Sequence, residues 1–272
     1  MKKAARIVSI AFISILFAGM CLFPIYIVFK ISLSAPRDIF AQNPPYLIEN
    51  FTLSHFREVL SSGDAFFGPL AKSMMTAALA GVLGVLVSIP AAYAISKFDF
   101  RLRYALILVI FVTRMVPEVS IALPISISFM KMGLFDTIPG LVMAHLVRIL
   151  PVSCFMMVGV FSGMPKDIEG QAYVDGATRM AALTKVVLPV SLSGISVAGM
   201  FSFLLSWDEF IYASYLTLAN PTMPLKMYYY ISRGDLFYSA TYAVIITAPV
   251  IILTAVLQRY IRPGYLSGAI RA

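Results

Sequence analysis

The segment Ile168–Pro189, with the sequence IEGQAYVDGATRMAALTKVVLP, is a mixed-charge, glycine-punctuated stretch in a chain that is otherwise strongly apolar. The 272 residues are 60% hydrophobic and only 12% charged, and their mean hydropathy is +0.88. Soluble domains are typically about 45–50% apolar and about 25% charged. The composition around this segment therefore indicates a membrane protein.

On both sides of the segment the apolar residues form long continuous blocks. A helix needs roughly 20 apolar residues to cross a bilayer core of about 30 Å. Lipid offers no partners to backbone polar groups, and the blocks do not alternate as barrel strands would, so the spans are expected to be helices. We expect an all-α polytopic membrane protein, a single domain over residues 1–272 with about six transmembrane helices at 7–29, 70–96, 104–128, 140–162, 188–217 and 242–260.

The lysines and arginines predict the orientation of these spans. With the N-terminus inside, the inner segments 1–6, 97–103, 163–187 and 261–272 carry more of them than the outer segments, although the outer segments are longer. The positive-inside rule then places both termini in the cytoplasm. The net charge of +8 fits contact with anionic membrane lipids, and no nucleic-acid partner is expected.

In this topology the segment 163–187 is a cytoplasmic loop between spans four and five. Asp167 and Glu169 fall in the first turn of a predicted helix, where the helix dipole favours acids. Gly176 can take the left-handed conformation that ends a helix, and Thr178 can cap a second one. Such a hairpin is either an ordinary amphipathic loop or a docking element for a cytoplasmic partner.

The residues of this hairpin resemble a family motif. Glu169, Ala172, Asp175-Gly176-Ala177 and Leu188-Pro189 resemble the EAA loop of permease subunits of ATP-binding-cassette (ABC) importers. Ser206-Trp207-Asp208-Glu209-Phe210 resembles the SWNEF signature of the carbohydrate branch. Further matches in the same order lie at Asn50–Leu53, Thr113–Pro117 and Gly133–Thr137. Together they are similar to the six-span, maltose-type permease subunit.

The resemblance implies a type I ABC importer transmembrane fold and a transport permease, not an enzyme. In the family the loop forms a coupling helix that sits in a groove of the ATPase. The resemblance implies that the coupling residues of this chain are Glu169, Ala172, Asp175, Gly176, Ala177 and Pro189. The implied partners are a second permease, two ATPase subunits and a soluble or lipid-anchored sugar-binding protein. The implied location is a bacterial or archaeal cytoplasmic (inner) membrane.

The chain departs from the family pattern at three positions. Gly170 and Gln171 stand where the motif has Glu and Ala, and Asp208 stands where the signature has Asn. Glu169 lies one position earlier than the motif acid, so either Glu169 substitutes for it in the ATPase contact or the partner differs. Gly170 also weakens its helix by about 1 kcal/mol relative to Ala.

The sequence carries no energy source of its own. No GxxxxGK[ST] phosphate loop occurs, so ATP and Mg²⁺ are expected on a partner ATPase and no cofactor in this chain. His55 and His145 stand alone in the sequence, and Cys21 and Cys154 lie in apolar blocks, so neither a metal cluster nor a nucleophile–base pair is expected. Active transport then requires another subunit.

Five charged residues fall well inside the predicted spans, away from the span ends, where charge is costly and usually functional: Arg114, Glu118, Arg148, Asp208 and Glu209. Arg114 and Glu118 are four apart, on one face of a continuous third span. Carboxylates and arginines can bind sugar hydroxyls, and Trp207 can lie against a sugar ring. The predicted substrate pathway comprises Trp207, Asp208, Glu209, Arg114 and Glu118. The alternative is that the pairs Arg114–Glu118 and Arg148–Glu209 only hold helices together.

Two other kinds of residue mark the spans. Prolines fall inside several spans, where each can kink its helix or simply pack: Pro90, Pro117, Pro124, Pro151 and Pro249. Tyr93 lies near a span end and is expected in an interfacial aromatic belt.

The predicted mechanism is alternating access that imports a di- or oligosaccharide. Two alternatives remain open. The acidic pair Asp208–Glu209 would suit a cation, so the same architecture could import a polyamine. The other alternative is a stand-alone secondary transporter or an intramembrane enzyme.

Overall fold

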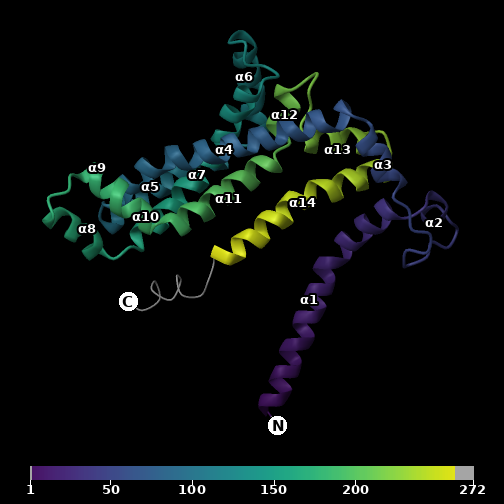
Figure 1. Ribbon diagram of the computed structural model, residues 1–272, viewed down its shortest axis with the longest axis horizontal. Helices are drawn as coiled ribbons and strands as arrows, with labels where there is room; N and C mark the ends of the chain where they lie inside the picture. The colour runs from purple at the N-terminus through teal and green to yellow at the C-terminus, as the bar shows by residue number, and fades with distance from the viewer. Residues whose placement is uncertain (1, 261–272) are drawn as a thin grey trace. The chain divides into compact units, whose positions relative to one another are not determined.

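The computed structural model describes residues 2–260, and this part of the chain is built of helices (Figure 1). Among these residues there is no strand, only an isolated bridge between Ser34 and Phe51. The all-α prediction is confirmed. The predicted inner segment 261–272, which carries the C-terminus, lies outside the described residues.

The chain divides into two compact units. The first comprises Met1–Phe67 and Lys226–Pro249, and the second comprises Gly68–Leu225 and Val250–Ala272. The first unit contains α1 (Lys2–Leu33), α2 (Pro36–Ile39), α3 (Ser54–Ser61) and most of α13 (Met223–Ser232) and α14 (Leu236–Tyr260). The second contains most of α4 (Asp64–Ser96), then α5 (Phe100–Val112), α6 (Glu118–Lys131), α7 (Ile138–Ser162), α8 (Lys166–Val174), α9 (Arg179–Ala182), α10 (Leu188–Val190), α11 (Leu192–Trp207) and α12 (Ile211–Leu216).

Four helices of the described chain are long and apolar enough to cross a membrane: Ser9–Leu33, Asp64–Ser96, Ile138–Ser162 and Leu236–Val256. Two further helix pairs pass the same test together, but each is bent. The bend is 79° between Arg101–Met115 and Glu118–Lys131, and 78° between Arg179–Val190 and Leu192–Trp207. Counted as broken spans, these pairs bring the number to the six that the sequence predicts.

The third span is therefore not the continuous helix expected over 104–128. Proline disfavours the helical conformation of the residue before it, and it lacks a backbone donor. Val116 is accordingly extended, with φ −73° and ψ 125°, between a 3-10 turn at Thr113–Met115 and the start of α6. The prediction that Arg114 and Glu118 share one helix face is wrong, because the break separates them.

The fifth span is also interrupted. The helical path from Arg179 runs through a π-helical turn at Leu183–Val187 and α10, and it bends at Ser191. A proline ring clashes with the carbonyl four residues earlier, and for Pro189 that carbonyl belongs to Lys185, inside the widened π turn. The helix expected to reach residue 217 ends at Trp207, and the chain re-enters a helix at Ile211.

Helices α4, α7 and α11 pack closely in the second unit. Small residues allow such an approach in membranes. A β-carbon on Gly84 of α4 would lie 2.5 Å from Ile149 Cγ2 of α7. The buried cluster there includes Ala92, Met157 and Ala198, and it extends to Val187 in the π turn. The base of the α8–α9 hairpin is thus fixed to the packed helices, at the end of the unit away from α6 and α12 (Figure 1).

Candidate functional site

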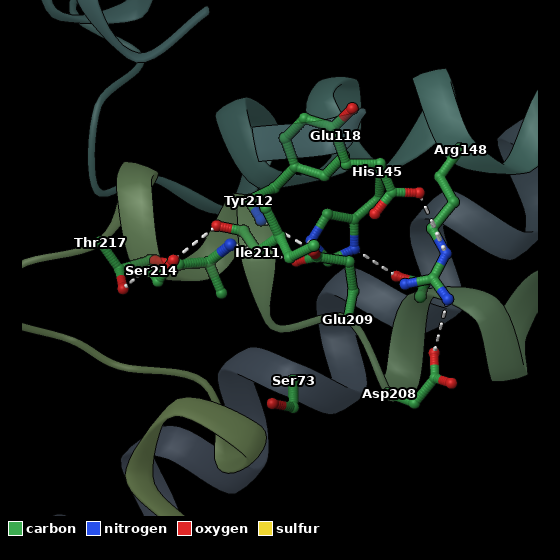
Figure 2. Close-up of polar contacts among 12 residues, drawn as sticks. Ser73, Glu118, His145, Arg148, Asp208, Glu209, Ile211, Tyr212, Ser214 and Thr217 are labelled. Carbon is green, nitrogen blue, oxygen red and sulfur yellow. Dashed lines mark hydrogen bonds and ion pairs between the residues drawn. The ribbon is translucent and has the colours of Figure 1, made fainter. Parts of the chain in front are cut away.

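Arg148 of α7 lies between two carboxylates that come from the two helix breaks, as Figure 2 shows. Its Nε is 3.7 Å from Glu118 Oε1, and its terminal nitrogen is 3.8 Å from Asp208 Oδ1. Glu118 is the first residue of α6, and Asp208 follows the last residue of α11. Arg114, in the 3-10 turn, completes the group through a 2.9 Å ion pair with Glu118. We call these four residues the charged cluster.

The charged cluster is balanced and partly open. It holds two cations and two carboxylates, and the side chain of Asp208 is 64% exposed whereas those of the other three are 21–28% exposed. The contacts of Arg148 are longer than hydrogen bonds, which usually measure about 2.7–3.2 Å. Arg148 Nε has no hydrogen-bond partner among the described residues. The cluster can therefore exchange these loose contacts for hydrogen bonds to a polar solute.

Directly behind Asp208 lies a second polar group that is fully buried. Glu209 and His145 are each 1% exposed, and Glu209 Oε2 is 3.2 Å from His145 Nε2. The Nδ1 atom of His145 lies 2.6 Å from Ser206 Oγ. Glu209 also accepts hydrogen bonds from the backbone of Tyr212 and Ala213, at 2.7 and 3.0 Å. It thereby supplies an acceptor to the free donors at the start of α12.

This arrangement corrects two sequence predictions. Arg148 does not pair with Glu209; it contacts Glu118 and Asp208 instead. His145 is not alone, although nothing adjacent to it in the chain reveals its partners. Only their spacing could have indicated these contacts. His145 and Arg148 are three residues apart and so lie on the same side of α7, where both can contact the neighbouring acids Asp208 and Glu209.

Ser206, His145 and Glu209 follow the order of contacts of a hydrolytic triad, which the sequence did not reveal. In such a triad the nucleophile must reach the substrate carbonyl. Ser206 is only 4% exposed, and the other two residues are 1% exposed. The group therefore has the character of a structural lock between α7 and α11.

Trp207 is buried as well. Its indole stacks on Phe203 with the ring centroids 5.9 Å apart and the planes 12° apart, and 1% of the residue is exposed. Of the residues predicted for the substrate pathway, Arg114, Glu118 and Asp208 thus belong to the open charged cluster. Trp207 and Glu209 lie behind it in this conformation.

The hairpin of α8 and α9 has the local structure that its sequence predicts. Asp167 and Glu169 lie in the first turn of α8, and Gly176 has a φ of +83°. Thr178 caps α9 by accepting a hydrogen bond from the Ala181 backbone at 3.2 Å. A left-handed glycine and a side-chain cap together make the tight turn between the two helices.

The two faces of α8 differ. Glu169 and Ala172 are buried, at 7% and 8% exposure. Val174 is 88% exposed, and the turn residues Asp175 and Gly176 are exposed too. Among the predicted coupling residues, Glu169 and Ala172 therefore face the permease chain, whereas Asp175 and Gly176 face outward.

Glu169 is held by residues from the end of α4. Its Oε2 pairs with Lys97 Nζ, and its Oε1 accepts a hydrogen bond from Tyr93 at 2.5 Å. Tyr173 of α8 donates a second one to Oε1, also at 2.5 Å. Burial alone would raise the pKa of Glu169, but these donors more than offset it and hold the pKa below its usual value. Tyr93, expected in an aromatic belt, is part of this contact.

A cavity of about 930 Å³ opens beside this contact, between the ends of α4, α5, α7 and α8. Its charged lining comprises the cations Lys97, Arg103 and Arg179 and the acids Asp99 and Glu169. Gly170 borders it, and a β-carbon there would meet no atom within 4 Å.

Residues 84–267 match the family described as "Binding-protein-dependent transport system inner membrane component". The chain belongs to this family. The permease is 27% identical to the trehalose transport system permease protein SugB of Mycobacterium tuberculosis, over 98% of its own chain and 99% of the relative. It is 28% identical to the trehalose/maltose transport system permease protein MalG of Thermococcus litoralis, over 95% and 94%.

A solved structure shows the fold of the permease. It is the crystal structure of a bacterial ABC transporter involved in the import of the acidic polysaccharide alginate. The TM-score is 0.75 at 22% sequence identity, and the match covers 95% of the permease and 98% of that chain. The predicted family and the predicted importer transmembrane fold are confirmed. The permease is a multi-pass inner-membrane transport protein.

Proposed function

We propose that the permease forms the translocation pathway for a di- or oligosaccharide in an ATP-driven importer, with the charged cluster as part of the sugar site. The observation that carries the site is the meeting of two broken spans at Arg148, which brings polar side chains together in an apolar region. Charged residues within spans are expensive and usually mark transport paths. The transport of trehalose and maltose by two relatives supports a sugar as the cargo.

The balance of the charged cluster favours a neutral solute over a cation. Asp208 is accompanied by Arg148, so the site does not present the unopposed acidic pair that would suit a polyamine. Sugar hydroxyls both donate and accept hydrogen bonds. Asp208 and Glu118 would accept from them, and the terminal guanidinium nitrogens of Arg148 would donate.

Trp207 and Glu209 are proposed to take part from behind. Glu209 is locked to His145 and to the start of α12, so it fixes the backbone that carries Asp208. Trp207 fills the space between this backbone and Phe203. A rigid support of this kind lets a site hold its geometry while the solute exchanges.

The energy is proposed to enter through the hairpin. Its outer turn Val174–Ala177, in which Val174, Asp175 and Gly176 are exposed and Ala177 is half-buried, would dock on a cytoplasmic ATPase subunit, which binds ATP and Mg²⁺. Pro189 at the end of the hairpin would pass the movement to α11. A second permease, a second ATPase subunit and a soluble or lipid-anchored binding protein complete the proposed assembly, and both termini are proposed to lie in the cytoplasm. Alternating access follows if ATP closure moves the hairpins and opens the spans outward.

The test is uptake by the reconstituted importer. The permease is co-purified from native membranes with its bound chains and reconstituted in vesicles with its binding protein. Labelled trehalose, maltose and spermidine are then compared with and without ATP inside. We expect ATP-dependent sugar uptake that falls strongly in Asp208→Ala and stays normal in the exposed control Asp64→Ala. Sugar uptake by the permease alone on an ion gradient, or transport of spermidine only, would refute the proposal.

A further inference from the structure

Glu169 has little free capacity for a partner subunit, because three donors occupy most of the roughly four acceptor positions of its carboxylate. Its two oxygens already receive three donors, from Tyr93, Lys97 and Tyr173, and the residue is 7% exposed. Charge-assisted hydrogen bonds of this kind are short and about twice as strong as neutral ones. An ATPase could reach this carboxylate only by displacing donors of the permease itself.

The contact joins the ends of two helices that are far apart in sequence. Tyr93 lies in the last turn of α4, and Lys97 follows that helix directly. Glu169 lies in the first turn of α8. A helix C-terminus favours a cation and a helix N-terminus favours an anion, so the dipoles of both helices strengthen the Lys97–Glu169 pair.

The same contact extends to α7. The Tyr93 ring packs edge-on against Phe161, with the centroids 5.9 Å apart, and Lys97 Nζ lies 4.7 Å from the centre of the Tyr93 ring. Tyr93 is thus bonded at its hydroxyl to the hairpin and packed at its ring against a span. The Lys97 side chain is 47% exposed, so its ion pair alone would be weak, and the buried carboxylate and the Tyr93 hydroxyl carry the connection.

The position of the acid decides which way it points. The motif that this hairpin resembles has its acid at Gly170, one residue later. One residue turns a helix by about 100°. Gly170 is exposed, whereas Glu169 is buried against α4. Glu169 therefore serves a contact inside the permease.

We propose that Glu169 is a positioning residue that fastens the coupling hairpin to the end of α4, so that a movement of the hairpin is transmitted directly to this span. The inference rests on the proposed docking of the hairpin on an ATPase. The outer turn Val174–Ala177 would make the docking contact with the ATPase. Glu169, Tyr93 and Lys97 would transmit the movement of the hairpin to α4.

The first experiment separates docking from transmission in the complete reconstituted importer. We expect Glu169→Gln to co-purify with as much ATPase as the unchanged permease. Its ATP hydrolysis should no longer respond to sugar-loaded binding protein, and sugar uptake should fall about tenfold, within the usual range of coupling between sites. Asp167→Asn, an exposed acid in the same turn, should behave as the unchanged permease. Loss of the ATPase from Glu169→Gln, or unchanged uptake, would overturn the proposal.

The second experiment replaces the contact by a covalent one. Lys97→Cys and Glu169→Cys are combined in a background with Cys21→Ser and Cys154→Ser, and they are joined by a flexible thiol-specific cross-linker. We expect low uptake before cross-linking and recovery after it, because a fixed link is what transmission needs. Failure of the cross-link to recover uptake would show that Glu169 has another role.

The two proposals fail in different ways. If the unchanged permease retains no ATPase, the proposed function fails. If the permease retains the ATPase but the Glu169 variants transport sugar as well as the unchanged protein does, the proposed docking is supported and the inference about Glu169 fails.

Discussion

His145 Nε2 lies 3.2 Å from Glu209 Oε2, and neither residue exposes more than 1% of its surface. The contact joins the middle of α7 to the break after α11. The other ring nitrogen of His145 contacts Ser206, so the histidine contacts the residues on both sides of Trp207 and Asp208 in the chain. The exposed Asp208 of the proposed pathway thus lies in a short segment that contacts His145 at both ends, through Ser206 and through Glu209.

Removal of the Glu209 carboxylate should destabilise the permease strongly. Glu209→Ala leaves His145 and the backbone donors of Tyr212 and Ala213 without their acceptor, and each buried orphan costs about 1–3 kcal/mol. The midpoint of thermal unfolding in detergent should fall clearly, and less in Glu209→Gln, which keeps an acceptor. Asp208→Ala is the matched control, because its side chain is 64% exposed. Equal decreases of the unfolding midpoint in Glu209→Ala and Asp208→Ala would contradict a stabilising role of the buried Glu209–His145 contact.

Substitution of Arg148 by lysine should affect transport more than stability. Arginine presents a planar fork of donors, whereas lysine offers a single compact charge. Arg148→Lys cannot face Glu118 and Asp208 from separate nitrogens as Arg148 does. We expect sugar uptake to fall about tenfold, as for the loss of roughly 1.4 kcal/mol of solute binding, with an unchanged unfolding midpoint. An unfolding midpoint that falls together with uptake would assign Arg148 a purely structural role.

Asp136 should make stability depend on pH. It lies in the turn between α6 and α7, where Lys72 Nζ is 2.7 Å from its Oδ1 and the Ala219 backbone donates to its Oδ2 at 2.9 Å. Burial would raise the pKa of Asp136, but the hydrogen bonds from Lys72 and Ala219 outweigh it and lower the pKa. A lowered folded-state pKa adds stability that is present above the unfolded value of about 4 and is lost as the pH falls through the folded value.

The measurement compares unfolding midpoints of the unchanged permease and Asp136→Asn from pH 7 down to pH 3. We expect a constant advantage of the unchanged permease above about pH 5 and a shrinking one below about pH 4. The exposed Asp64→Asn should show no such trend. A difference that stays constant to pH 3 would contradict the ionic character of the Lys72–Asp136 contact.

Two glycines should respond to alanine in opposite ways. Gly84→Ala places a β-carbon 2.5 Å from Ile149 Cγ2, and overpacking of this kind costs about 1–3 kcal/mol. Gly170→Ala meets nothing within 4 Å and should stabilise α8 by about 1 kcal/mol. Unfolding midpoints check both, and Gly84→Ala should cost less in an Ile149→Ala background than in the unchanged permease, because the clashing Cγ2 atom is removed there. A neutral Gly84→Ala would contradict the close packing of α4 on α7.

The sequence predicted those structural elements that are determined by residues close together in the chain. The spans follow from apolar length, and the hairpin follows from the first-turn acids, Gly176 and Thr178, all of which act within a few residues. The family could be named from its motifs. Residues whose state depends on distant partners were predicted less well, as His145 illustrates: its contacts with Ser206 and Glu209 come from another helix.

The prolines show the same limit. Pro90, Pro124, Pro151 and Pro249 all lie inside helices that continue past them, whereas Pro117 ends one. Nothing in the residue type distinguishes Pro117. What differs is the next residue, since Glu118 at the bend contacts both Arg114 and Arg148, and the latter belongs to α7. A break held by a partner on another helix is invisible to the local pattern.

The same break has a consequence for the biogenesis of the permease. The insertion machinery accepts a segment according to its apolarity, while the chain is still being synthesised and before the helices associate. Residues 104–128 satisfy that criterion as one stretch, whereas Arg148, which holds Glu118 at the 79° bend, emerges from the ribosome later. The nascent chain would thus insert its third span as one segment that Pro117 already weakens at Val116, and the bend would be held in place only after α7 has joined. A ribosome-bound chain that stops before Ile138 would still lack the contact between Glu118 and Arg148.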